Sequence, residues 1–195
     1  MVLIQSISGV RGLVETDLSS LKSRQYARAV HFMQPKGVII IGRDSRPSGE
    51  EITMEIVDEF IHLGRNVIDC GIVPTPTVQF LVGQSDAAGG IVVTASHNPI
   101  EWNGLKFIRG DGIFFYPQEC DELFSLVDDH SKTESSNQKG MYWKDKNSIQ
   151  KHIIHNVSLN CINLKNIRRR KFKVVIDAVN GAGAVALPAM LEALG

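Results

Sequence analysis

Three short, largely apolar runs, separated by longer stretches of mixed polarity, restrict the fold of this chain more than any other feature. They are GVIIIGR at 37–43, NVIDCG at 66–71 and GGIVVTA at 89–95. Apolar runs of this length are typical of strands that are buried on both faces. Strands that alternate with helical stretches predict a mostly parallel mixed sheet between two layers of helices. We therefore expect an α/β protein with a three-layer α/β/α domain.

The stretches between the runs have the spacing of amphipathic helices. The first contains apolar residues three to four positions apart, at Ile52, Ile56, Phe60 and Leu63. Ser48, which precedes them, is of a residue type that caps helices. The segment 73–82 is expected to start a helix after two prolines, whose fixed φ suits a first turn. A further helix is expected at 116–130.

The last third of the chain has a different character. Residues 131–140 are polar and aperiodic, which predicts a linker or an exposed loop. A helix is expected near 147–160, followed by a strand at 172–177, a glycine-rich turn and an apolar helix. We therefore expect a complete domain at 1–140. Residues 141–195 are expected to be a linker helix and the incomplete start of a second, similar α/β domain, so that the chain is a piece of a longer protein.

Composition and charge exclude several classes of function. With 195 residues, 43% of them apolar, the chain can bury a core. Lysine plus arginine equals aspartate plus glutamate at 21 each, so no overall field attracts nucleic acid or an anionic membrane. The sequence has no signal-peptide pattern and no run long enough to span a bilayer. The three cysteines lack metal-binding or redox spacing, so we expect reduced thiols in a cytoplasmic protein, with the oligomeric state left open.

The segment TASHNPIEWNGLKF (94–107) places polar residues at the end of a buried strand. Ser96 and His97 follow the strand directly, at the edge where open α/β sheets bind their ligands. Asn98 begins an Asn-Pro turn, and Lys106 lies in the next strand-like run. A serine beside a histidine is by itself most often part of a turn, but here the surrounding chain is shaped around Ser96.

Two arginine-containing motifs precede this segment. In SGVRG (8–12), two glycines flank Arg11, whose planar guanidinium matches the oxygens of a phosphate, although a surface turn also explains the pattern. In GRDSRPSG (42–49), Asp44 and Arg46 follow a strand and precede a helix. This motif predicts either an anion site at the helix N-terminus or an Arg–Asp network that holds the loop in shape, and we favour the network.

Taken together, these motifs resemble those of the α-D-phosphohexomutase family, the phosphoglucomutases, phosphomannomutases and phosphoglucosamine mutases. The motifs occur in the family's order: SGVRG, GRDSRPSG, GIVPTPTVQFLV and TASHNPIEWNGLKF, with DAVNGAG resembling the entry to the second domain. The resemblance covers the first of the family's four domains and the start of the second. It implies that Ser96 carries a phosphoryl group and contributes a ligand to Mg²⁺. It also implies that Arg11, His97 and Lys106 are cationic and acid–base residues, and that Arg11, Lys106 and Asn98 contact the substrate.

The implied reaction interconverts hexose or hexosamine 6-phosphate and 1-phosphate through phosphoserine and a bisphosphate intermediate. Hexose 1,6-bisphosphate would act as the activator, and aspartates absent from this chain would complete the Mg²⁺ site. A phosphoserine carries about −1.5 to −2 charge, so cations and not a carboxylate are needed beside Ser96. His97 or Lys106 could move the hydroxyl proton. The isolated chain is expected to be inactive. Within the family, EWNGLKF most resembles the phosphoglucosamine mutases, and members with neighbouring specificities share this loop.

Two other functions stay open at this point. A serine hydrolase could use Ser96 and His97, but it would need an acidic partner and an oxyanion hole. A non-catalytic module could bind phosphosugars or assemble with another subunit. His152 and His155, one helical turn apart, could ligate a metal, but a solvated helix is the favoured interpretation.

The mutase hypothesis makes a geometric prediction. The head groups of Arg11, His97 and Lys106 should converge around Ser96 in one solvent-open cleft, since their loops and strands share one rim of the sheet.

Overall fold

A computed structural model describes residues 3–129 and 136–195. Within these residues one seven-stranded sheet forms the centre of the molecule, in the order β1-β2-β6-β5-β3-β4-β7. The strands are β1 (Ile4–Ser6), β2 (Gly9–Leu13), β3 (Ile39–Arg43), β4 (Val67–Ile72), β5 (Gly89–Val93), β6 (Trp102–Arg109) and β7 (Tyr142–Lys144). Strands β5, β3, β4 and β7 are parallel, whereas β6 runs antiparallel to both β5 and β2, and β1 runs antiparallel to β2. Five of these seven strands therefore point the same way.

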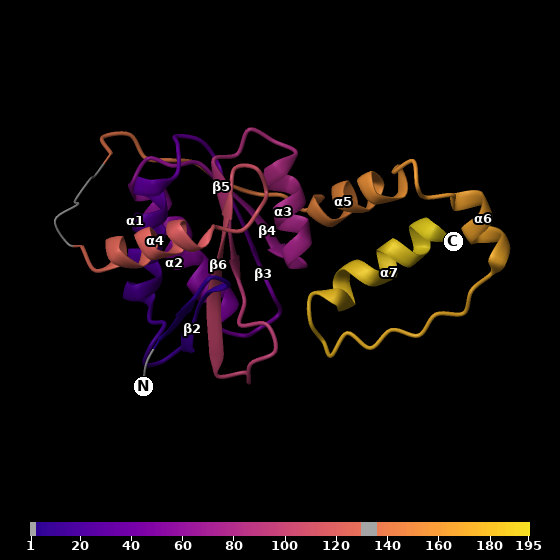
Figure 1. The fold of residues 1–195 in the computed structure, drawn as a ribbon, viewed down its shortest axis with the longest axis horizontal. Helices are drawn as coiled ribbons and strands as arrows, with labels where there is room; N and C mark the ends of the chain where they lie inside the picture. Colours follow the sequence, from indigo (N-terminus) through magenta and orange to yellow (C-terminus); the bar gives the residue numbers. More distant parts are fainter. Residues whose placement is uncertain (1–2, 130–135) are drawn as a thin grey trace.

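Helices cover both faces of the sheet, as Figure 1 shows. They are α1 (Ser20–Met33), α2 (Gly49–His62), α3 (Thr75–Gly83), α4 (Pro117–Val127), α5 (Ser148–Val157), α6 (Leu164–Arg170) and α7 (Gly183–Leu194). Helices α1, α2 and α4 pack on one face and α3 on the other, while α5, α6 and α7 lie beyond α3. The predicted three-layer α/β/α fold is confirmed.

The core is divided between the two faces by the alternation of side chains along each strand. In β3, Ile39 and Ile41 belong to the larger cluster, beneath α1, α2 and α4. Ile40, between them, belongs to the smaller cluster beside α3, together with Val78 and Val82 of that helix. Because both faces are apolar, the strand is a continuous apolar run, which is the pattern recognised in the sequence.

Most of the predicted helices form close to their expected bounds, but two details differ. Ser48 precedes α2 without capping it: its own backbone is helical (φ −72°, ψ −12°) and its side chain makes no capping bond. Instead its Oγ accepts a hydrogen bond of 2.9 Å from Asn103 Nδ2. The helix predicted at 116–130 ends at Val127, and residue 130 lies outside the described residues.

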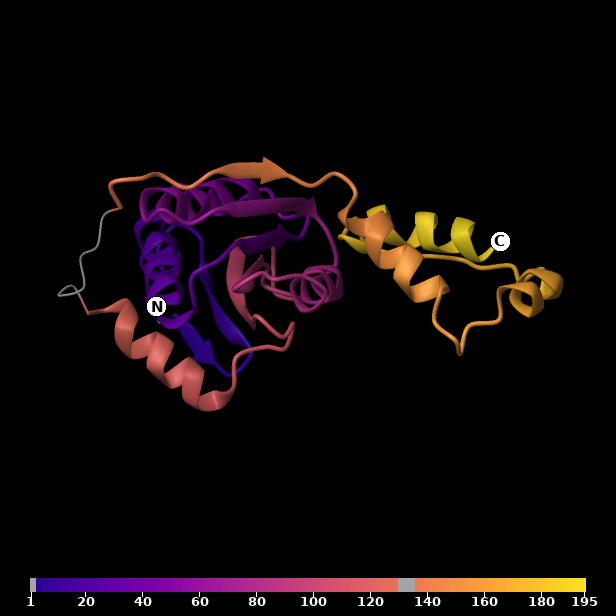
Figure 2. The same cartoon turned by 90° about the horizontal axis from the view of Figure 1, so that it is seen from above.

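The predicted linker is only partly described. Residues 131–135 lie outside the described residues, and 136–140 are irregular. The chain then enters β7, which pairs in parallel with β4 and lies at the edge of the sheet (Figure 2). This short strand was not predicted, and it lies beyond the boundary expected at residue 140. The division into two domains stays a prediction.

The strand predicted at 172–177 is wrong. The segment is irregular and largely solvent-exposed, with Val175 95% exposed. A strand needs a neighbour to take up its backbone hydrogen bonds, and none pairs with this segment in the described part of the chain. The apolar helix expected after it is present as α7. No helix among the described residues has both the length and the apolar character needed to cross a bilayer.

Candidate active site

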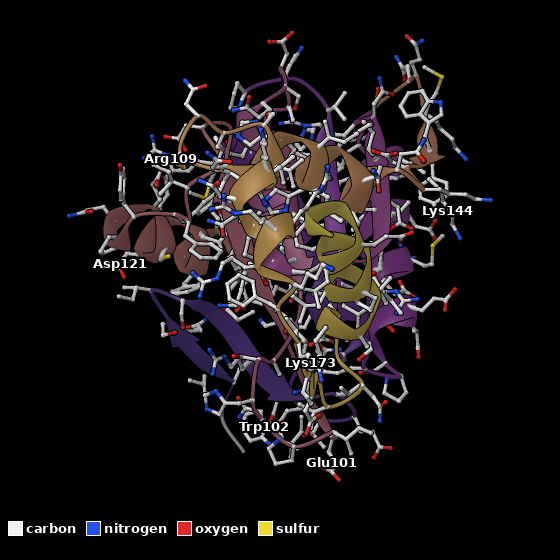
Figure 3. All side chains as sticks on the ribbon, turned by 90° about the vertical axis from the view of Figure 1, so that its right-hand side faces the viewer. Glu101, Trp102, Arg109, Asp121, Lys144 and Lys173 are labelled. Atoms are coloured by element: carbon white, nitrogen blue, oxygen red, sulfur yellow. The ribbon has the colours of Figure 1, made fainter. Side chains whose placement is uncertain are left out.

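The candidate site lies at one edge of the sheet, where parallel strands β3 and β5 both end. The loop 44–48 follows β3, and the loop 94–101, here called the serine loop, follows β5. Strand β6 begins at the same edge, because it runs antiparallel to β5. Figure 3 shows Glu101 and Trp102, at the end of the serine loop, at the lower end of the sheet. Two loops distant in sequence therefore meet there, as expected for an α/β sheet.

Ser96 has an unusual backbone. Its φ is +59°, in the left-handed region that residues with a Cβ rarely adopt. Its N–H donates a hydrogen bond of 3.0 Å to Thr94 Oγ1, and the N–H of Asn98 donates one of 3.2 Å to the carbonyl of Ala95. The residue is exposed, whereas Thr94 and Ala95 before it are buried. The serine is thus exposed to solvent on a tight turn that follows two buried residues.

Arg46 binds backbone carbonyl groups of the serine loop and of Trp102, the first residue of β6. Its guanidinium donates hydrogen bonds of 2.6–3.0 Å to four carbonyl oxygens, those of Ser96, Asn98, Pro99 and Trp102. Its side chain is only 12% exposed. A planar guanidinium with five donors suits such a convergent set of acceptors. Arg46 therefore joins the loop after β3 to the loop after β5.

Asp44 connects Arg46 to Thr94. Its Oδ2 accepts hydrogen bonds from Thr94 Oγ1 at 2.6 Å and from Arg46 Nε at 3.2 Å, and its Oδ1 accepts one from the Arg46 N–H at 3.0 Å. The Arg–Asp network favoured from the sequence is confirmed. Its extension to Thr94 and to the serine loop was not predicted, because nothing in the sequence says which loops a sheet brings together.

A cleft of about 880 Å³ lies beside the serine loop. One wall includes Ser96, His97 and Asn98, and the other is formed by 178–182, the turn before α7. Ser45 Oγ donates a hydrogen bond of 2.7 Å to the carbonyl of Asn180, so the two walls are in contact. Part of the predicted site, Ser96 with His97 and Asn98, therefore lines one open cleft.

Arg11 lies within β2 and not in the surface turn that its flanking glycines also suggested. Its Nη1 donates a hydrogen bond of 3.2 Å to Asn98 Oδ1, which ties it to the serine loop. Gly104 of β6 is its partner in the sheet. A Cβ at Gly104 would lie 3.0 Å from Arg11 Cγ and 2.8 Å from the Thr94 carbonyl oxygen. It would also clash with the Val10 carbonyl oxygen, so a glycine is needed there because the backbones of β2 and of the serine loop approach β6 so closely.

Lys106 lies on β6 opposite Val92, with Leu105 and Phe107 on either side facing the larger core cluster. Its Nζ is 5.1 Å from the centre of the Phe114 ring. Burial lowers the pKa of Lys106, and the positive charge of Arg11 lowers it further. The contact with Phe114 was not predicted from the sequence.

The structure does not bring all the predicted residues to the cleft wall. Within the described residues, the cleft lining includes neither Arg11 nor Lys106. Arg11 reaches the serine loop through Asn98, and its charge acts on Lys106. The convergence of Arg11, His97 and Lys106 on the hydroxyl of Ser96 stays a prediction.

The residues present do not by themselves form a site for Mg²⁺. Residues 3–129 and 136–195 contain no group of three or more His, Cys, Asp or Glu side chains arranged to hold a metal ion. The carboxylate of Asp44, close to Ser96, is occupied by Arg46 and Thr94. His152 and His155 pack against the Phe80 ring, with centroids 4.8 and 4.7 Å from it.

Comparison with known proteins identifies the family. Residues 4–134 match the family model described as phosphoglucomutase/phosphomannomutase, alpha/beta/alpha domain I. The chain is 32% identical to a phosphoglucomutase/phosphomannomutase of Thermococcus kodakarensis, covering 96% of this chain and 42% of that protein. It is 33% identical to the phosphoglucosamine mutase of Thermobifida fusca, covering 100% of this chain and 44% of that protein.

A solved structure has the same fold. The crystal structure of a phosphoglucomutase/phosphomannomutase family protein from Burkholderia thailandensis superposes with a TM-score of 0.73 at 24% identity, over 98% of this chain and 43% of that one. The chain thus spans less than half the length of the relatives it matches. On the match of residues 4–134, about two thirds of its length, the chain belongs to the α-D-phosphohexomutase family of phosphoglucomutases and phosphomannomutases.

Proposed function

We propose that Ser96 is the phosphoryl carrier of a mutase that interconverts hexose or hexosamine 6-phosphate and 1-phosphate through a bisphosphate intermediate. One observation carries the proposal: an exposed serine hydroxyl on a left-handed turn, at the wall of an open cleft and beside an arginine-bound asparagine. The geometry suits a group that must hold a phosphate and release it to a sugar. Hexose 1,6-bisphosphate is the activator expected to load Ser96.

The reaction proposed for Ser96 is a simple exchange of oxygen–phosphorus bonds. A sugar hydroxyl attacks the phosphorus of phospho-Ser96; the new sugar O–P bond forms and the Ser96 Oγ–P bond breaks. The proton of the sugar hydroxyl passes to a base, and Ser96 Oγ regains a proton on release. After the bisphosphate reorients, its other phosphoryl group returns to Ser96 by the reverse exchange. The guanidinium groups of Arg11 and Arg46, which are bound to the serine loop, would offset the charge on the transferring group.

For the proton transfer we favour Lys106 over His97. Lys106 is partly buried and its pKa is lowered, so that more of it is neutral near pH 7 than of an ordinary lysine. Arg11, which lowers that pKa, is itself bound to Asn98 of the serine loop. We assign Arg11 and Asn98 to phosphate binding. His97, exposed at the cleft wall, is assigned to substrate contact.

A serine hydrolase is the weaker candidate. The carboxylate in the network beside Ser96 is that of Asp44, and it is bonded to Arg46 and Thr94. Across the described residues no hydrogen bond joins His97 to a carboxylate, as a triad would require.

In the proposed mutase, a phosphate on Ser96 would supply one oxygen to Mg²⁺, and the remaining ligands would be side chains other than those described. A cytoplasmic location completes the proposal.

Phosphopeptide mapping tests the assignment of Ser96. The full-length protein that contains this chain is incubated with glucose 1,6-bisphosphate and Mg²⁺, digested and analysed by mass spectrometry, beside its Ser96→Ala variant. We expect phosphate on the peptide that contains Ser96 and none on the variant. Ser45 and Ser48, in the neighbouring loop, serve as internal controls. Phosphate on either of them and not on Ser96 would overturn the proposal, as would labelling of Ser96 by a fluorophosphonate with no phosphorylation.

A further inference from the structure

We propose that Arg46 is a positioning residue for phosphoryl transfer, which holds the backbone of the serine loop in the one conformation that presents the Ser96 hydroxyl. The inference rests on the proposed function of Ser96. It adds a role to a residue whose guanidinium contacts carbonyl oxygens and a carboxylate. Arg46 lines the same cleft as Ser96.

The first argument is the number and direction of the contacts. Four carbonyl groups of residues 96–102 point at one guanidinium, which is largely buried beneath them. Oxygens that converge in this way repel one another unless a cation lies between them. The carbonyl of Ser96 itself is one of the four, at 3.0 Å from Nη2. Arg46 thus fixes the plane of the peptide bond that follows the nucleophile.

The second argument is the backbone of Ser96, which the loop would not adopt unaided. A positive φ is unfavourable in a residue with a Cβ and persists only where surrounding contacts over-determine it. Two contacts do so here: Arg46 on the carbonyl side of Ser96 and Thr94 Oγ1 on its N–H side. Asp44 joins both, since its Oδ2 accepts from each of them. The loop is therefore held at both sides of the nucleophile by one connected network.

Lysine cannot replace this arginine. An ammonium is a point charge with three donors, whereas the guanidinium spreads five donors across a plane. Two separate nitrogens of Arg46 serve the four carbonyl oxygens while a third binds Asp44. An Arg46→Lys variant keeps the charge but cannot donate to all these acceptors at once. It therefore separates a positioning role from a merely electrostatic one.

The experiment compares Arg46→Lys with wild type, both as the full-length protein that contains this chain, by hydrogen exchange and by phosphorylation kinetics. Arg43→Lys is the matched control, because Arg43 lies in the same stretch of chain, is 17% exposed and pairs with Glu50 outside the serine loop. In Arg46→Lys we expect the Asn98 and Trp102 amides, which are bonded within the loop, to exchange about tenfold faster. We expect Ser96 to be phosphorylated by glucose 1,6-bisphosphate about a hundredfold more slowly, with the half-saturating concentration unchanged. Arg43→Lys should match wild type in both.

A second pair of variants guards against a simple loss of folding. Thr94→Val removes the hydroxyl that bonds Asp44 and Ser96, and Thr94→Ser restores it. Thr94→Val should slow phosphorylation like Arg46→Lys, and Thr94→Ser should recover it, with the core amides of β5 unchanged in all variants. Unchanged loop exchange in Arg46→Lys would overturn the positioning role, as would faster exchange with an unchanged phosphorylation rate. If wild type itself is not phosphorylated on Ser96, the proposed function fails, and the exchange data alone decide whether Arg46 anchors the loop.

Discussion

Ser96 combines exposure with a backbone conformation that is unfavourable for its type. The left-handed φ of +59° places a side chain where a glycine would be more stable. Nucleophiles are often found under such strain, because the turn that projects a side chain out of the sheet is sharp. The strain at Ser96 can be measured without any substrate.

Substitution of Ser96 by glycine and by alanine should give an order of stability that is the reverse of the ordinary one. At φ +59° a Cβ costs about 1–2 kcal/mol, which outweighs the about 0.5–1 kcal/mol of extra chain entropy that glycine loses on folding. Ser96→Gly should therefore have a free energy of unfolding up to about 1 kcal/mol above that of Ser96→Ala, as measured by urea denaturation.

Ser125, exposed on α4, provides the control. In a helix, Ser125→Gly should be less stable than Ser125→Ala by about 1 kcal/mol. The same order at both positions would show that the backbone of Ser96 is unstrained in solution.

For single residues, the sequence predicts which side chains lie at the site better than it predicts their hydrogen-bond partners. Ser96, His97 and Asn98 were located from the end of an apolar strand, because strand and turn signals are local. The bond between Arg11 and Asn98 joins residues 87 positions apart, and no local pattern encodes it. Arg46 was assigned to a loop network on its proximity to Asp44, but its carbonyl partners depend on which strands are neighbours.

Helix α5 packs on α3 through an aromatic contact that includes a titratable side chain, His152. The Phe80 ring of α3 stacks on His152 at 4.8 Å and meets His155 at 4.7 Å. Thr77 Oγ1 and His152 Nδ1 are 3.0 Å apart. Burial lowers the pKa of His152 below its ordinary value of 6.5, and the nearby His155 lowers it further.

The docking of α5 should weaken as the pH falls. Because the folded state favours neutral His152, its contribution to stability is complete above pH 6.5 and is lost as the pH drops through the lowered pKa. The effect should be small, about 1–2 °C in Tm, since the ring is partly exposed and solvent screens the charge. Amide exchange in α5, measured from about pH 7.5 to about pH 5 and corrected for intrinsic rates, is the more sensitive measurement.

His152→Gln removes this titration, and His62→Gln, at an exposed position on α2, is the control. The pH dependence of α5 exchange should disappear only in the first. An equal pH dependence in wild type and His152→Gln would contradict the assignment.

Elements with a local pattern were predictable, and elements that depend on distant pairing were not. The apolar runs of β3, β4 and β5, the periodic spacing of α2 and the prolines at the start of α3 predicted the positions of these elements within a few residues. Strand β7 is three residues long and partly exposed, so it has no signature of its own and exists because β4 offers an edge. The segment 172–177 is the converse: its composition favours a strand, but no described strand lies beside it.

At the scale of the whole molecule, the exposed segment 172–177 favours self-association. Phe172, Val174, Val175 and Ile176 are 63%, 55%, 95% and 37% exposed. An extended, apolar and unpaired backbone is a template for pairing with another chain. This chain should therefore self-associate at high concentration through residues 172–176.

Val175→Lys should weaken that association and raise its Kd about tenfold or more, as measured by analytical ultracentrifugation. A charge at the most exposed position opposes strand pairing. Val185→Lys, at a half-exposed site on helix α7, should have a smaller effect. Equal effects of the two substitutions would point to general hydrophobic contact and not to strand pairing.

The bonds of Arg46 also bear on when, during folding, Ser96 reaches its outward-facing turn. They join residues 50 to 56 positions apart in sequence, and the Thr94–Asp44 bond spans 50. Contacts of such long range form only after the entropy of closing the intervening chain has been overcome, here by the pairing of β3 with β5. A newly synthesised chain would thus acquire its helices and its sheet before Ser96 turns outward. If Ser96 carries the phosphoryl group as we propose, phosphoryl acceptance would be among the last properties to mature, and an incompletely folded chain could not consume bisphosphate.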